Sequence, residues 1–270
     1  MPVLDCKLFT TDLDGTVLID EKEAGCRSTP RLKQALQALQ ARGTIVCLAS
    51  GRMHESIRII GKDLGVGGPV ISYNGAMLRD RSDAMLVHHT LDAALAAEVV
   101  ELADERQLPL NFYCDGILYA RKIQPWWDLY QGRSSSPMKP VDSLLPFRGR
   151  RPTKLLFCAP AETILALRDE LLPRFAGRAT VLITADEYLE VMPLEADKGH
   201  ALADLTQRLG LRPQDVVAVG DGNNDIGMID YAGTGIAIAN GREALKERAD
   251  VVVGPPESDG LAEYIEQTLL

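Results

Sequence analysis

Residues 7–16 read Lys7-Leu8-Phe9-Thr10-Thr11-Asp12-Leu13-Asp14-Gly15-Thr16, an apolar and β-branched run followed directly by two acids. The run predicts a buried strand that ends where the carboxylates begin. In an open parallel sheet, ligands bind outside the carboxyl ends of the strands. Two carboxylates one residue apart at such a place repel each other unless a cation or an acid–base role compensates. Asp and Gly are also ordinary turn residues, so a plain strand-to-loop turn is the alternative.

The same arrangement recurs in the outer parts of the chain. Apolar runs at 44–49, 69–73 and 216–219 each predict a buried strand, and polar residues follow each run: Ser50, Asn74 and Asp221. Helical periodicity separates the runs, and the first helix is expected to begin with Thr29 as its N-cap and Pro30 at its first position. The order β-α-β-α-β is typical of a doubly wound, Rossmann-like parallel sheet with right-handed crossovers, so the fold class is α/β.

The pattern changes after residue 78 and resumes before the helix that begins at Lys198. Short strands and a two-residue hairpin signal, Asp115-Gly116, alternate there with two long helical segments. Hairpins mixed with helices indicate an α+β unit with an antiparallel sheet. We therefore expect a core made of residues 1–78 and 188–270, with an inserted α+β domain at residues 79–187.

Composition and charge exclude several classes of protein. The length of 270 residues and the hydrophobic fraction of 46% are typical of a globular chain with one large or two ordinary domains. The net charge of −9 leaves no general footprint for nucleic acid or an anionic membrane. We expect no signal peptide, and no apolar run reaches the roughly 20 residues that a membrane span needs. The five cysteines form no CxxC pair, which favours reduced thiols in a cytoplasmic protein.

The polar residues at the strand ends point to phosphate chemistry. Asp12 and Asp221, with Asp225 as a further candidate, offer the oxygen ligands by which proteins hold Mg²⁺ near a phosphate. Lys198 follows Asp197 at the start of a predicted helix, where its ammonium could screen Asp12 and hold a phosphoryl oxygen.

A serine adds to this set. We expect Ser50 and the amide of Gly51 to open a helix, whose N-terminus favours an anion. Carboxylates, Mg²⁺, one lysine and a serine at a helix start together describe phosphoryl transfer through an aspartyl-phosphate.

Four short motifs occur in a fixed order: DLDGT at 12–16, ASGR at 49–52, DKG at 197–199 and GDGNND at 220–225. Together they resemble the four motifs of the haloacid dehalogenase superfamily of phosphotransferases. The YNGA sequence, the large insertion after it and the closing segments resemble the Cof-type subfamily, at 73–76, 233–241 and 259–260. The resemblance covers nearly the whole chain, although the insertion matches only in size and coarse pattern. It implies a Rossmann-like core with an inserted cap that closes over the site and selects the substrate.

The resemblance also implies a role for each matching residue. Asp12 would be the nucleophile that forms the aspartyl-phosphate, and Asp14 would protonate the leaving group and then activate water. Lys198 would be the third catalytic residue and would bind the transferring phosphoryl group. The phosphate or the substrate would be bound by Thr16, Ser50, Gly51, Arg52, Asn74 and Asn224. Mg²⁺ would be held by Asp12, Asp14 through its backbone carbonyl, Asp221 and Asp225.

The sequence therefore predicts a cytoplasmic, Mg²⁺-dependent phosphatase that hydrolyses phosphomonoesters of small metabolites, of the sugar phosphate or nucleotide and cofactor type. A second acid at Asp14 favours hydrolysis or mutase chemistry, so a phosphomutase is the alternative. A further alternative is a regulatory or binding protein that keeps a phosphorylatable aspartate, against which Asp14, Lys198 and the insertion argue. We expect no nucleic-acid or membrane partner. Neither the substrate nor the oligomeric state can be deduced from the sequence.

Single residues have plainer interpretations that stay open at this point. Ser50 could simply cap a helix, and Asn74-Gly75 is a common turn. The glycines at 65–68 fail as a dinucleotide motif, because they follow a helix and lack the third glycine. The basic run at 148–154 is by default a solvated segment, with contact to an anionic substrate as the minority hypothesis.

Overall fold

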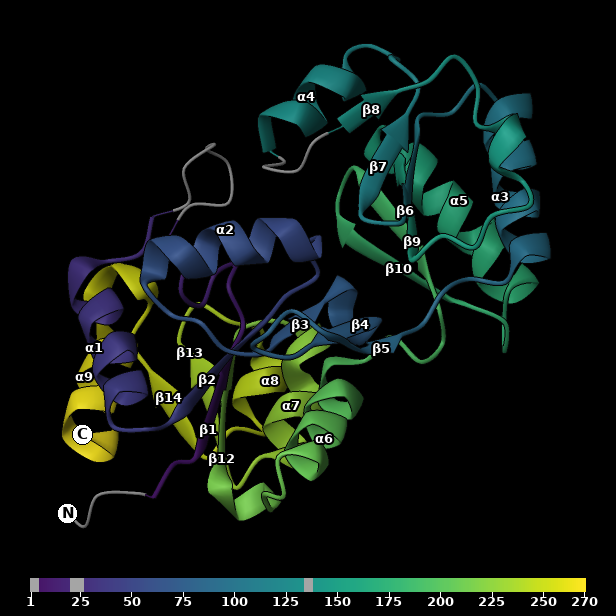
Figure 1. The fold of residues 1–270 in the computed structure, drawn as a ribbon. Helices are drawn as coiled ribbons and strands as arrows, with labels where there is room; N and C mark the ends of the chain where they lie inside the picture. The colour runs from purple at the N-terminus through teal and green to yellow at the C-terminus, as the bar shows by residue number, and fades with distance from the viewer. Residues whose placement is uncertain (1–4, 20–26, 134–137) are drawn as a thin grey trace. The chain divides into compact units, whose positions relative to one another are not determined.

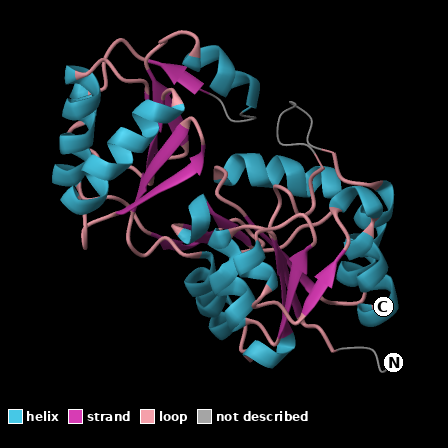
Figure 2. Cartoon of the chain, turned by 180° about the vertical axis from the view of Figure 1, so that it is seen from behind, coloured by secondary structure: helices cyan, strands magenta, loops and turns pink. Residues whose placement is uncertain are grey.

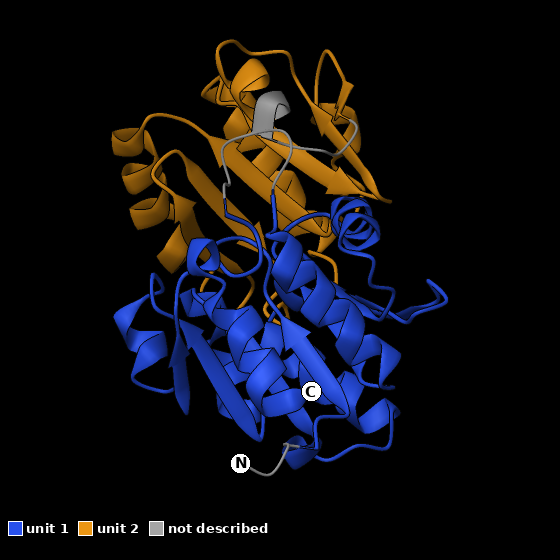
Figure 3. Cartoon of the chain, turned by 90° about the vertical axis from the view of Figure 1, so that its left-hand side faces the viewer, with its two compact units in different colours: residues 1–87, 197–270 blue, residues 88–196 orange. Residues whose placement is uncertain are grey.

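The structure is a computed structural model that describes residues 5–19, 27–133 and 138–270. The chain divides into two compact units, one formed by residues 1–87 and 197–270 and the other by residues 88–196 (Figure 3). Each unit combines helices with a sheet of its own (Figure 2). Among the described residues, no helix has both the length and the apolar character that crossing a bilayer requires.

The first unit is built on an eight-stranded sheet in the order β14-β13-β12-β1-β2-β3-β4-β5. Its strands are β1 Leu8–Thr11, β2 Ile45–Ala49, β3 Val70–Ser72, β4 Met77–Arg79, β5 Met85–His88, β12 Val216–Gly220, β13 Thr234–Ile238 and β14 Val251–Val253 (Figure 1). The strands from β14 to β3 pair in parallel, and β4 adds to β3 in the antiparallel sense. The predicted α/β fold with a doubly wound parallel sheet is confirmed.

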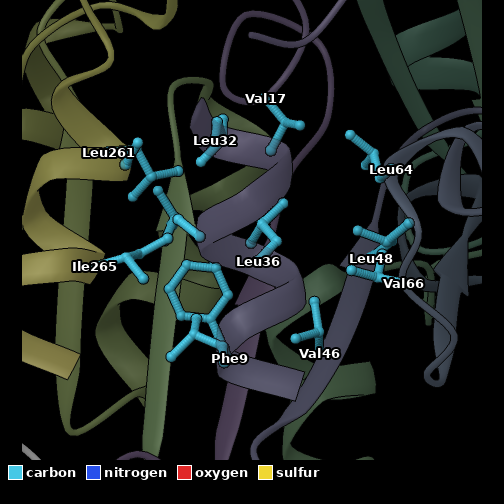
Figure 4. Packing of buried hydrophobic residues seen from close by; sticks show 14 of the residues in the cluster. Phe9, Val17, Leu32, Leu36, Val46, Leu48, Leu64, Val66, Leu261 and Ile265 are labelled. Atoms are coloured by element: carbon cyan, nitrogen blue, oxygen red, sulfur yellow. The ribbon is translucent and has the colours of Figure 1, made fainter. Parts of the chain in front are cut away.

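Helices cover both faces of this sheet, which is why its central strands are apolar on both sides. Their bounds are α1 Pro30–Ala41, α2 His54–Leu64, α6 Lys198–Arg208, α7 Ile226–Tyr231, α8 Glu243–Lys246 and α9 Gly260–Tyr264. On one face Phe9 packs with residues of α1, α2 and α9, such as Leu36 and Leu261 (Figure 4). On the other face Leu8 packs with residues of α6, α7 and α8, such as Leu202. Neighbouring residues of β1 thus serve opposite layers.

The start of α1 follows the sequence signals. Thr29 is the N-cap, and its hydroxyl accepts a hydrogen bond of 3.1 Å from the Leu32 amide. Pro30 occupies the first turn, where its missing N–H costs nothing.

The register of the central strands aligns their ends. Thr11, the last residue of β1, lies opposite Leu48 of β2 and Val219 of β12. All three strands run in the same direction, so the residues that follow them emerge at one edge of the sheet. This edge collects the polar residues that the sequence places after each strand.

The second unit contains a six-stranded sheet in the order β10-β11-β9-β6-β7-β8. Its strands are β6 Leu110–Cys114, β7 Ile117–Ala120, β8 Met138–Pro140, β9 Lys154–Cys158, β10 Thr180–Ala185 and β11 Tyr188–Met192. The pairs are antiparallel except β7 with β8. The helices are α3 Ala93–Glu105, α4 Trp126–Arg133 and α5 Ala161–Arg174, and α3 and α5 share a core with the sheet. The expected α+β architecture is confirmed.

Short helical turns complete the described elements. The 3-10 turns span Tyr73–Gly75, Leu145–Phe147, Pro213–Asp215, Asn223–Asp225 and Pro256–Ser258, and a π-helical turn spans Ile265–Leu269.

The unit boundaries differ from the expected ranges of 1–78 with 188–270 and 79–187. Strand β5, expected in the insertion, extends the eight-stranded sheet, so the first unit continues to Val87. Strand β11, expected in the core, pairs with β9 and β10, so the second unit continues to Ala196. A hairpin pattern predicts a strand but not the sheet to which the strand adds, and this is the reason for both differences.

Candidate active site

The centre of the site is a buried lysine that forms an ion pair with the aspartate after β1. Lys198, at the first position of α6, is fully buried, and its Nζ lies 2.6 Å from Asp12 Oδ1 and 2.6 Å from Asp225 Oδ1. Asp12 follows β1 and is anchored by a backbone hydrogen bond of 2.9 Å to the Val219 carbonyl of β12. Residues that are 186 positions apart in the chain thus form one buried ion pair.

The electrostatics of this group are set by burial and by the surplus of acids. Burial raises the pKa of Asp12 well above its usual range, against the charge of Lys198, and the neighbouring carboxylates of Asp225, Asp14 and Asp221 raise it further. Burial lowers the pKa of Lys198, but the charges of Asp12 and Asp225 outweigh it and raise that pKa. The site therefore holds more negative charge than one lysine compensates, and this excess favours a bound cation.

Asp225 is fixed by the loop that follows β12. Its Oδ2 accepts hydrogen bonds from the amides of Asp221 at 3.1 Å and Gly222 at 2.9 Å, while its Oδ1 accepts the bond from Lys198. This carboxylate consequently ties the loop to α6. It is 1% exposed.

Three carboxylates form a possible metal site. Asp12, Asp221 and Asp225 each offer one oxygen, and these oxygens lie within 4.8 Å of one another. Thr16 is fully buried and donates a hydrogen bond of 3.1 Å from its hydroxyl to Asp221 Oδ1. A set of carboxylate oxygens suits a hard divalent cation such as Mg²⁺. Thr16 therefore orients the Asp221 carboxylate of the acidic cluster through this hydrogen bond.

The second acid of the first motif lies in a different environment. Asp14 is paired with Arg52, whose Nε lies 2.8 Å from Oδ2 and whose Nη2 lies 2.5 Å from Oδ1. Its side chain is 25% exposed, in contrast to the buried Asp12. Ser50 Oγ lies 3.4 Å from Asp14 Oδ2 and accepts a hydrogen bond of 3.2 Å from the Arg52 amide. The two acids of the motif therefore have separate partners.

The expected position of Ser50 and Gly51 at a helix start is wrong. Helix α2 begins at His54 with Met53 as its N-cap, so Ser50 neither opens nor caps it. The physical reason is that the backbone carbonyls of Ser50 and Arg52 accept hydrogen bonds of 3.1 Å from the Asn74 and Tyr73 amides. Residues 50–52 therefore form a loop that is attached to the turn after β3.

The two predicted asparagines contact each other. Asn224 Nδ2 donates a hydrogen bond of 3.0 Å to Asn74 Oδ1. Asn74 is 7% exposed, and a Cβ on Gly51 would lie 2.9 Å from its Oδ1. The residues predicted for phosphate or substrate binding are thus brought together at the same edge of the sheet as the acids.

The loop after β13 also contacts the site, although no role was predicted for it. The Asn240 side chain donates a hydrogen bond of 3.3 Å to the Gly15 carbonyl, and the Arg242 amide donates one of 2.8 Å to the Asp221 carbonyl. A sequence signal similar to that of the other strands exists, since Asn240 follows the buried run of β13 after one exposed alanine, Ala239.

Comparisons with known proteins find relatives by sequence and by structure. A sequence model of the haloacid dehalogenase-like hydrolases matches residues 9–265. The HMP-PP phosphatase of Serratia proteamaculans is 30% identical over 97% of this chain and 95% of its own length. The 5-amino-6-(5-phospho-D-ribitylamino)uracil phosphatase YwtE of Bacillus subtilis is 24% identical over 97% and 98%. The crystal structure of a haloacid dehalogenase-like hydrolase from Bacteroides thetaiotaomicron superposes with a TM-score of 0.89 at 28% identity, over 97% and 99%.

Proposed function

The chain belongs to the haloacid dehalogenase-like hydrolases, and we propose that it hydrolyses phosphomonoesters of small metabolites through an aspartyl-phosphate formed on Asp12. The resemblance read from the four motifs is confirmed, and the names of the relatives support a phosphatase enzyme. The observation that supports the mechanism is the difference in environment between the two acids. Asp12 is buried against Lys198, whereas Asp14 is partly exposed and paired with Arg52.

In the first step, we assign the attack on phosphorus to Asp12. Lys198 holds Oδ1, so Oδ2 is the oxygen that forms the new bond to phosphorus while the bond to the ester oxygen breaks. Asp14 enters this step in its protonated form and gives that proton to the departing oxygen. Lys198 and the Ser50 hydroxyl bind oxygens of the transferring group, supported by their positions beside Asp12 and Asp14.

In the second step, Asp14 takes a proton from water as the water oxygen attacks phosphorus. The bond between phosphorus and Asp12 then breaks, which releases inorganic phosphate and restores the Asp12 carboxylate. The same residue therefore serves as acid and then as base.

The acidic cluster fits Mg²⁺ as the cofactor. The three carboxylates within 4.8 Å supply only oxygen donors, which is the donor set that Mg²⁺ prefers. Asp12, Asp221 and Asp225 would hold the ion, together with the Asp14 backbone carbonyl that the family resemblance implies. When bound, Mg²⁺ supplies Lewis-acid stabilisation of charge on the phosphoryl group.

The remaining parts of the proposal concern substrate and location. Substrates of the sugar phosphate or nucleotide and cofactor type are supported by the small phosphorylated uracil compound in the name of one relative. We assign substrate selection to the second unit, the inserted cap of the family resemblance. A cytoplasmic location is supported by the free thiols of Cys6, Cys47, Cys114 and Cys158.

We predict that Asp12→Asn abolishes turnover, because the amide has no anionic oxygen to attack phosphorus. Release of phosphate from para-nitrophenyl phosphate, measured with and without Mg²⁺, should fall at least about 10³-fold, the scale on which loss of a nucleophile acts. Asp169→Asn, which removes an exposed carboxylate paired with Arg168, is the matched control and should leave turnover unchanged. Wild-type rates in Asp12→Asn would contradict the mechanism. A requirement for a bisphosphorylated activator, with little free phosphate released, would instead indicate a phosphomutase.

A further inference from the structure

The turn after β3 has an unfavourable backbone conformation. Tyr73, Asn74 and Gly75 have φ values of +51°, +53° and +97° in succession. Non-glycine residues seldom adopt the left-handed region, and two in a row are rarer still. Such residues persist only where their surroundings hold them, and they gather at functional sites. All three residues of this turn are buried.

One side of the turn holds the loop that carries Ser50. The Asn74 amide donates a hydrogen bond of 3.1 Å to the Ser50 carbonyl, and the Tyr73 amide donates one of 3.1 Å to the Arg52 carbonyl. The Asn74 side chain packs directly on Gly51, where a Cβ would lie 2.9 Å from its Oδ1. The position of Ser50 is therefore tied to the backbone of this turn.

The same turn contacts two further segments of the site. Asn74 Oδ1 accepts the hydrogen bond of 3.0 Å from Asn224, which belongs to the loop after β12. Gly75 lies against the backbone of Asp197, whose carbonyl oxygen a Cβ on Gly75 would overlap. Asp197 is the N-cap of α6, and Lys198 follows it directly. The turn thus contacts three segments that are far apart in the sequence: the loop with Ser50, the loop with Asn224 and the start of α6.

We propose that Asn74 is a positioning residue, and that the turn Tyr73–Gly75 aligns the segments carrying Ser50, Asn224 and Lys198 on one phosphoryl group. The inference rests on the proposed function, and it differs from the sequence-based assignment of Asn74 to substrate binding. The side-chain oxygen of Asn74 is already engaged by Asn224, and the residue is 7% exposed. Each group that binds one tetrahedral anion must be held within about 0.5 Å of its productive position, and a shared support favours this.

A double-mutant cycle tests the side chain. Asn74→Gly keeps the positive φ accessible and removes only the amide. We expect kcat for para-nitrophenyl phosphate to fall about 10- to 100-fold, with KM changed less than about threefold, as for a misplaced catalytic group. The hydrogen bond to Asn224 is one of two contacts by which the Asn74 side chain acts, and the other is its packing on Gly51. The loss in Asn74→Gly/Asn224→Ala should therefore be clearly smaller than the product of the two single losses. Losses that multiply in the double variant would show an independent contact of Asn74 with substrate and would overturn the inference, as would wild-type kcat in Asn74→Gly.

Two glycines test the backbone of the turn. Gly75→Ala introduces a Cβ against Asp197, whereas Gly43→Ala meets no atom within 4 Å at the same φ of +97°. We expect faster hydrogen–deuterium exchange of peptides covering 50–52 and 222–225 in Gly75→Ala and in Asn74→Gly. Gly43→Ala should exchange like the wild type at both places.

This exchange measurement separates the two hypotheses, because it needs no turnover. Unchanged exchange in both turn variants, or the same increase in Gly43→Ala, would overturn the role of the turn. A wild-type protein that releases no phosphate would contradict the proposed function instead. Where Gly75→Ala does not fold, Asn74→Gly supplies the result.

Discussion

At the scale of single residues, Gly15 shows how tightly the first motif is built. Its φ of +77° and its position beside Asp221, where a Cβ would lie 2.5 Å from Oδ2, leave no room for a side chain. We predict that Gly15→Ala displaces the Asp221 carboxylate and lowers kcat/KM about 10- to 100-fold, as expected when a group at the site shifts by about 1 Å. Phosphate release at saturating Mg²⁺ would measure the effect.

The backbone strain of Gly15→Ala, about 1–2 kcal/mol for a left-handed alanine, needs a control of its own. Gly116→Ala has a φ of +73° and meets no atom within 4 Å, so it reproduces the strain without the contact. If Gly116→Ala reduced activity as much as Gly15→Ala, the displacement of Asp221 would not be the cause.

At the scale of secondary structure elements, the crossing of α6 and α7 positions the lysine and its second partner. Gly199 lies one residue after Lys198, and a Cβ at that position would overlap the backbone of Gly227 in α7. Asp225 immediately precedes α7, so the close approach of the helices keeps Lys198 and Asp225 within 2.6 Å. We predict that Gly199→Ala lowers the free energy of unfolding by about 1–3 kcal/mol, because the backbones must separate. Thermal unfolding followed by circular dichroism would report a lower Tm.

Gly149→Ala is the matched control for this helix crossing. It adds the same methyl group where no atom lies within 4 Å, and its φ is outside the left-handed region. The Tm of this control should stay at the wild-type value. Equal Tm values for Gly199→Ala and the wild type would contradict the prediction, because α6 and α7 would then accommodate the added methyl group without separating.

At the scale of the whole molecule, repulsion between the acids of the site destabilises the folded state, and a bound cation can relieve this repulsion. In a chain of net charge −9, Asp12, Asp221 and Asp225 offer oxygens within 4.8 Å of one another beside one lysine. We predict that Mg²⁺ stabilises the folded protein, by about 2.7 kcal/mol at 100 times its Kd, which calorimetry would detect as a rise in Tm. The rise should shrink as the pH falls, because burial raises the pKa of Asp12 and protons then compete with the ion.

The variant Asp221→Asn identifies where this stabilisation arises. It removes one charged oxygen donor from the cluster and should abolish most of the Mg²⁺-dependent rise in Tm. Asp169→Asn removes an exposed carboxylate in the second unit and should keep the full rise. An equal rise in both variants would place the bound ion elsewhere on the protein.

The amino-acid sequence by itself determined the strands, the first helix and the residue types of the site. Apolar runs such as 8–11 and 45–49 predict buried strands because both faces of a parallel sheet are covered, and the stripe Leu32, Ala35, Leu36 and Leu39 predicts the buried face of α1 for the same reason. The motifs after the strands predicted the family. Each motif is a short run of neighbouring acids and glycines, so it can be recognised in the sequence without knowing how the chain packs.

Only the tertiary structure decided which of these residues meet. The pairing of Lys198 with Asp225, the contact of Gly15 with Asp221 and the hydrogen bonds from the turn after β3 to the loop of Ser50 depend on strand register and helix crossing, which no local pattern specifies. The late start of α2 and the unit boundaries were missed for the same reason, since the backbone partners that decide them lie far away in the chain. Local periodicity reflects burial within one element, whereas the site arises from hydrogen bonds and packing between elements.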